Sequence, residues 1–84
     1  MIVDTDNYRT DATFTQNTIF NGITGKNIYV SPGVVLILEG ICGVNVYLNN
    51  NSYCEIDGIV DGDFIYGEGT FDYFGVVEGE IRKS

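Results

Sequence analysis

The sequence predicts an all-β fold, a single-domain parallel β-solenoid of about four coils with 18 residues in each coil. The first observation behind this prediction is a glycine followed by Ile or Val, which recurs at Gly22-Ile23, Gly40-Ile41, Gly58-Ile59 and Gly75-Val76. The second is a short apolar strand a few residues after each pair, at 27–30, 45–48, 63–66 and 80–82. Two separate features that recur in register indicate stacked coils, each too small to bury its own apolar face.

Alternation within each repeat predicts which side chains fill the interior, because successive residues of a strand face opposite sides. One set of strands is expected to point inward with Thr18, Phe20, Val34, Leu36, Leu38, Ser52, Cys54, Ile56, Phe71 and Tyr73. Two further inward columns are expected, namely Ile23, Ile41, Ile59 and Val76, and Ile28, Val46, Phe64 and Ile81. The Gly, Asn and Asp residues between the strands suit tight corners.

The chain of 84 residues has the length of one domain. Residues 1–8 do not fit the repeat and are expected to cap the first coil, so that the coils occupy residues 9–81. A helical alternative is disfavoured, because eleven glycines are scattered along the chain and no stripe with a period of 3.6 residues is present.

Two segments resemble a known repeat. Residues 58–64 (GIVDGDF) and 75–81 (GVVEGEI) are similar to the G-x-V-x-G-x-I repeat of bactofilins, which are bacterial filament-forming proteins with a right-handed β-helix. The resemblance covers roughly residues 20–81. It implies a right-handed coil and the capacity for end-to-end assembly.

The charge balance is strongly acidic, with twelve Asp and Glu against four Lys and Arg and a net charge of −8. No Lys or Arg occurs from Asn27 to Ile81. Such a field repels phosphates, so neither nucleic acid nor an anionic membrane is an expected partner, whereas a basic protein would be attracted. Because no apolar run reaches the length of a membrane span or a signal peptide, we expect a soluble cytoplasmic protein.

Catalytic groups are sparse. The chain contains no histidine, and no basic residue lies near Cys42 or Cys54 in the sequence to activate a thiol. Cys54 falls in an inward column, Cys42 follows Ile41 near a corner and is expected to be partly exposed, and no disulfide between them is expected. Asp61-Gly62-Asp63 resembles the start of a calcium loop, but Ile65 stands where the next oxygen ligand is required. We therefore predict no enzyme activity, no metal site and no cofactor.

The outward-facing residues are the candidates for binding a partner. Stacking is expected to place Asp61 beside Glu78 and Asp63 beside Glu80, although like charges on neighbouring strands are destabilising. The remaining candidates are acidic and tyrosine residues on other outward columns, namely Glu39, Glu55, Asp57, Asp72, Tyr29, Tyr47 and Tyr53. Apolar and tyrosine side chains bordered by carboxylates are typical of protein-binding surfaces, and a solvated corner or a structural tyrosine ladder is the alternative interpretation.

Three functions remain open at this point. The first is a small acidic inhibitor, of the immunity or antitoxin type, that masks a basic partner such as a toxin nuclease. The second is a bactofilin-like structural protein that assembles into filaments. The third is a fragment of a phage or surface fibre or spike.

Overall fold

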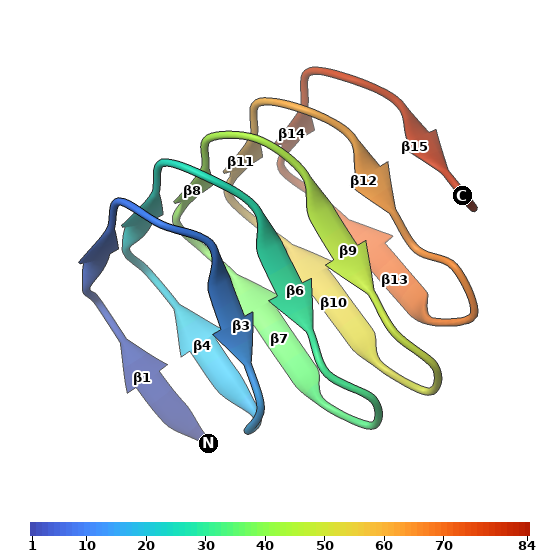
Figure 1. Ribbon diagram of the computed structural model, residues 1–84, viewed down its shortest axis with the longest axis horizontal. Helices are drawn as coiled ribbons and strands as arrows, with labels where there is room; N and C mark the ends of the chain where they lie inside the picture. Colours follow the sequence, from blue (N-terminus) through green and yellow to red (C-terminus); the bar gives the residue numbers. More distant parts are fainter.

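The computed structural model describes residues 1–84 and confirms the parallel β-solenoid. Its 15 strands form three sheets of five strands each, and all neighbouring strands are parallel and come from successive coils. The chain thus winds round a three-sided core, with its two termini at opposite ends of the stack (Figure 1). It contains no helix with the length and apolar character needed to cross a bilayer.

Each coil contributes one strand to each sheet. Sheet A consists of β1 (Ile2–Asp4), β4 (Thr18–Phe20), β7 (Val35–Leu38), β10 (Tyr53–Ile56) and β13 (Thr70–Tyr73). Sheet B consists of β2 (Asn7–Tyr8), β5 (Ile23–Thr24), β8 (Ile41–Cys42), β11 (Ile59–Val60) and β14 (Val76–Val77). Sheet C consists of β3 (Ala12–Phe14), β6 (Ile28–Val30), β9 (Val46–Leu48), β12 (Phe64–Ile65) and β15 (Ile81–Arg82).

The stack has five coils, whereas the sequence predicted about four. Residues 1–8, which we expected to form a cap, supply β1 and β2, and these strands pair in register with β4 and β5. The first coil departs from the sequence repeat in two ways. Ile2 pairs with Thr18, an offset of 16 residues, and Asp6-Asn7 stands where later coils have Gly-Ile.

The interior columns of sheets A and C are those that the alternation predicted. Phe20, Leu36, Leu38, Cys54 and Ile56 from sheet A are fully buried. They meet a sheet C column that contributes Ile28, Val46 and Phe64, which are also fully buried. Tyr73 continues an inward column but is 52 % exposed, because it belongs to the last coil and no further coil covers it.

Sheet B has the opposite orientation to the one predicted. Ile23, Ile59 and Val76 are 46 %, 37 % and 47 % exposed, and Ile41 is only half-buried. The residue after each of them points inward instead, as the fully buried Thr24, Cys42 and Val60 and the half-buried Val77 show. Cys42 therefore lies in the core, contrary to the expectation that it would be partly exposed.

A column of glycines explains how the chain turns from sheet A into sheet B. A Cβ atom on Gly40 or Gly58 would lie 2.0 or 1.9 Å from a carbonyl oxygen of the preceding coil, at Gly22 and Gly40 respectively. The coils approach so closely at this corner that no side chain fits between them. The Gly-Ile repeat seen in the sequence is thus the signature of this contact.

Candidate functional site

The predicted site residues lie on all three faces of the solenoid rather than on one. Sheet B is bordered by Glu39, Asp57, Asp61 and Glu78. The outer face of sheet A carries Tyr53, Glu55 and Asp72. Sheet C carries, on it or beside it, Tyr29, Tyr47, Asp63 and Glu80. The three groups differ in what their side chains contact, and those contacts separate structural residues from free ones.

Sheet B presents an exposed apolar column that we call the isoleucine stripe, made of Ile23, Ile41, Ile59 and Val76. These residues pair directly across β5, β8, β11 and β14, so they form an unbroken line along the solenoid axis. β-Branched side chains suit a strand, but these four are exposed or half-buried rather than packed in the core. From the sequence, this column was expected to lie inside the core.

Two short rows of carboxylates border the isoleucine stripe. The first row, Glu39 and Asp57, lies at the corner before the stripe, and the second row, Asp61 and Glu78, lies immediately after sheet B. The Asp61 N–H donates to the Cys42 carbonyl at 2.8 Å, and the Glu78 N–H to the Val60 carbonyl at 2.9 Å. The backbone of the second row is therefore held in the ladder, while all four side chains are exposed.

Neither carboxylate row takes part in a salt bridge. The structure has two salt bridges, Arg82 with Asp63 at 3.3 Å and Lys83 with Glu68 at 3.4 Å, so two of the twelve acidic residues are paired. Both bridges use basic residues of the C-terminal segment. None of the four carboxylates beside the isoleucine stripe has a basic side chain as a partner.

A second acidic cluster covers the outer face of sheet A. A hydrogen bond with the Asp57 carboxyl is the largest cause that raises the pKa of Glu55 above its usual range, and the charges of Asp72 and Glu39 add to it. The Tyr53 hydroxyl donates to Asp72 Oδ2 at 2.9 Å. Partial burial, then this hydrogen bond, raises the pKa of Tyr53 to about 12. Since the folded pKa of Glu55 is raised, folding gains stability as the pH falls through that value.

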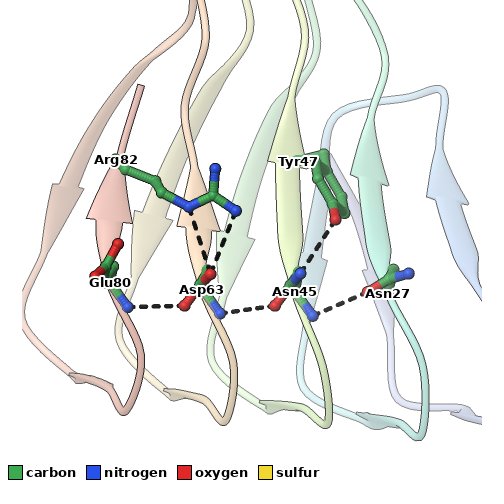
Figure 2. Close-up of polar contacts among 6 residues, drawn as sticks. All are labelled: Asn27, Asn45, Tyr47, Asp63, Glu80 and Arg82. Atoms are coloured by element: carbon green, nitrogen blue, oxygen red, sulfur yellow. Dashed lines mark hydrogen bonds and ion pairs between the residues drawn. The ribbon is translucent and has the colours of Figure 1, made fainter. Parts of the chain in front are cut away.

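Asp63 and Glu80 do not face each other as two free carboxylates. They belong to an Asx ladder in which a side-chain oxygen of one coil accepts the backbone N–H of the next (Figure 2). The N–H groups of Asn45, Asp63 and Glu80 donate at 3.0, 2.8 and 2.9 Å to the oxygens one coil earlier. The full ladder is Asp11, Asn27, Asn45, Asp63 and Glu80.

The ladder gives Asp63 a structural role. The backbone N–H of Glu80 is the largest cause that lowers the pKa of Asp63, and the Arg82 guanidinium lowers it further. With a depressed folded pKa, this carboxylate stabilises the fold above the unfolded pKa of aspartate, and that contribution is lost as the pH falls through the folded value. Both carboxylate oxygens are thereby engaged within the protein.

The tyrosine pair is also integrated into the solenoid. Tyr29 and Tyr47 stack with ring centroids 5.1 Å apart and an interplanar angle of 10°. The Tyr47 hydroxyl accepts a hydrogen bond from Asn45 Nδ2 at 3.1 Å, which links the stack to the Asx ladder (Figure 2). Ile65, the next residue of this outer column, is only 8 % exposed between Tyr47 and Arg82. The outer face of sheet C thus behaves as a second packed layer.

Replacing Asn45 with alanine tests the ladder. The change removes the acceptor for the Asp63 N–H and the donor to Tyr47, so we expect a loss of about 1–3 kcal/mol in the free energy of unfolding. Urea denaturation followed by circular dichroism measures this loss. Asn50→Ala is the control, because Asn50 is exposed and its side chain makes no hydrogen bond, and equal stability of the two variants would contradict the structural role.

The remaining reactive groups and the cavity lie in the core or away from the predicted site residues. Both cysteines are free and fully buried, and burial raises the pKa of each thiol. The structure brings no three acidic or cysteine side chains into an arrangement that could hold a metal ion. A cavity of about 370 Å³ lies at the N-terminal end, where Asp4, Tyr8 and Asp11 are among its lining residues. No predicted site residue lines it.

The outward orientation of the isoleucine stripe is the feature of the candidate site that sequence reasoning missed. Strands of two residues contain too little alternation to decide which residue points inward. A usable signal was present in the size of the second residue, since Thr24 and Cys42 are small, as an interior corner requires.

No known protein family matches the chain, and no characterised protein or solved structure shows significant similarity to it. The likeness to bactofilins therefore extends to a β-helical repeat alone.

Proposed function

We propose that this protein is a non-catalytic acidic binding module that covers a basic surface of a partner protein. The single observation that carries the proposal is the isoleucine stripe with its two bordering rows of unpaired carboxylates. Exposed apolar residues surrounded by charged ones have the anatomy of a protein interface, in which the apolar centre supplies affinity and the rim supplies specificity.

The charges favour a partner of opposite sign. A net charge of −8 on a rigid body of 84 residues steers a basic protein toward the acidic faces and raises the association rate. The phosphate-binding surface of a nuclease-type toxin is a basic target of this kind. Masking such a surface, as an immunity protein or antitoxin does, requires a rigid negative surface and no catalytic group.

Charge reversal beside the stripe tests this function. The unmodified protein is first tested for binding to a panel of purified basic nuclease domains. For each domain that binds, we expect Asp61→Lys with Glu78→Lys to weaken the affinity about tenfold at low salt. The same change should flatten the dependence of binding on salt concentration. Binding is measured by isothermal titration calorimetry at two ionic strengths.

The matched control is Asp6→Lys with Glu68→Lys, which gives the same net charge at exposed positions outside both carboxylate rows. If both double variants weaken binding equally, net charge rather than the second carboxylate row governs the interaction. If no basic domain binds the unmodified protein at low salt, the proposed function is wrong.

End-to-end assembly of the bactofilin kind is the second candidate. It is supported by the last coil, where β13, β14 and β15 each have one unpaired edge and the inward residues Phe71 and Val77 are not fully covered. Against it, Asp4 points inward in the first coil and accepts a hydrogen bond from Tyr8 at 2.6 Å, and an inward charge discourages pairing at an edge. Light scattering across a concentration series separates the two functions, because growing polymers contradict the binding module.

A further inference from the structure

We infer that the isoleucine stripe receives a basic amphipathic α-helix of the partner, laid along the solenoid axis. The inference rests on the proposed function and goes further, because it names the face that binds and the secondary structure that it recognises. Three properties of sheet B lead to it, namely the spacing of the stripe, the flatness of its border and the position of its charges.

The spacing of the stripe matches a helix and not a strand. Neighbouring strands lie about 4.8 Å apart, so the four side chains of the stripe form a line about 14 Å long. Apolar residues at alternating steps of three and four along a helix recur every ~5.2 Å, close to this rung spacing. Side chains on one face of an extended strand recur every ~6.7 Å, so they fall out of register with the side chains of the stripe after two coils. A helix of about ten residues covers the whole line.

The border of the stripe is flat enough for a helix to approach. On one side lies the glycine column that includes Gly40 and Gly58, which has no side chains. On the other side, Gly25 and Gly43 precede Asp61 in the same column of the repeat. Beside Ile23 and Ile41 the ridge therefore has bare backbone on both sides, where apolar residues of a helix can pack, whereas Asp61 and Glu78 stand beside Ile59 and Val76.

The two carboxylate rows flank the ridge and lie within reach of a helix seated on it. Asp57 and Asp61 are four residues apart in the chain, on either side of Ile59, so their Cα atoms are separated by at most ~13 Å. An α-helix with its side chains is about 10–12 Å across. Lys or Arg residues on both flanks of a helix seated on the stripe reach one carboxylate row each. This charge complementarity selects a basic amphipathic helix as the occupant.

Two synthetic peptides of identical composition test the inference. In the first, leucines recur every three and four residues and lysines flank them, which gives an amphipathic helix. In the second, leucines and lysines alternate, which gives the pattern of a strand. Fluorescence anisotropy at low salt should show that the first peptide binds at least about tenfold more tightly, and circular dichroism should show that it gains helix on binding.

Variants of the stripe locate the binding face. We expect Ile41→Glu with Ile59→Glu to weaken binding of the helical peptide at least about tenfold, because charged groups then replace the centre of the ridge. Ile19→Glu with Val35→Glu is the control. It adds the same two charges at half-buried outward positions of sheet A and should leave binding within about twofold. Circular dichroism of the free proteins confirms that both variants remain folded.

The outcomes distinguish failure of this inference from failure of the proposed function. Equal, salt-sensitive binding of both peptides, unaffected by Ile41→Glu with Ile59→Glu, would overturn the helix and its docking face while leaving an acidic binding module. A larger loss with the sheet A control would overturn the assignment of the face in the same way. Absence of binding by both peptides at low salt would overturn the inference and the proposed function together.

Discussion

Gly58→Ala is expected to cost roughly 3 kcal/mol or more of folding stability. A Cβ atom at this position would lie 1.9 Å from the Gly40 carbonyl oxygen and 2.7 Å from the Glu39 carbonyl oxygen. Both neighbours are backbone, which cannot rotate away, so the two coils must separate and lose ladder hydrogen bonds. A domain of this size has a total stability of about 4–13 kcal/mol, so this single methyl group removes a large share of it.

Gly25→Ala is the matched control in the same fold. Its Cβ atom would meet only the Tyr8 carbonyl oxygen, at an ordinary contact distance of 3.7 Å, and Gly25 does not need a positive φ. We expect a change within about 0.5 kcal/mol of the unmodified protein. Urea denaturation followed by circular dichroism compares the two variants. Equal stability would mean that the coils are not in contact at the glycine column.

A second large effect is expected when aspartate is placed at Val60 but not when it is placed at Ile59. Val60 is fully buried, so Val60→Asp introduces an unpaired carboxylate into the core, costs several kcal/mol, and should leave most of the protein unfolded. Ile59 is 37 % exposed and points to solvent, so Ile59→Asp should cost at most about 1 kcal/mol.

Far-UV circular dichroism and thermal melting of the two aspartate variants check this pair. The comparison is sharp because the positions are adjacent in the chain and gain the same charge. If Ile59→Asp unfolds the protein and Val60→Asp does not, Ile59 rather than Val60 points into the core, as the sequence first indicated. The exposed isoleucine stripe would then not exist.

The fold was predictable from the sequence because a repeat imposes the same constraint on every coil. Leu36, Cys54 and Phe71 pair in register, and the alternation within strands of three or four residues identified the inward side chains correctly. The glycine column was visible for the same reason, since each of its members meets the backbone of a preceding coil. The first coil was missed because Asp6 takes the glycine position there, and no earlier carbonyl restricts it.

The candidate site was predictable only in part. Its acidic residues could be identified, but their division between free and structural roles depends on contacts that composition does not reveal. Asp63 repeats with Asn27 and Asn45 at steps of 18 residues, which marks it as a member of a ladder rather than as a surface charge. The orientation of sheet B was harder to predict, because Ile41-Cys42 and Ile59-Val60 are apolar at both positions and only the smaller size of the second residue distinguishes the inward side chain.

Sheet B directs its isoleucines outward, and the reactivity of Cys42 reports that orientation. Cys42 follows Ile41, is fully buried, and has a thiol pKa raised by burial. Titration with a thiol-specific reagent under native conditions is therefore expected to label neither Cys42 nor Cys54, while both react once the protein is unfolded in denaturant. Rapid labelling of Cys42 in the folded protein would place that residue outside and Ile41 inside, and would contradict the proposed binding face.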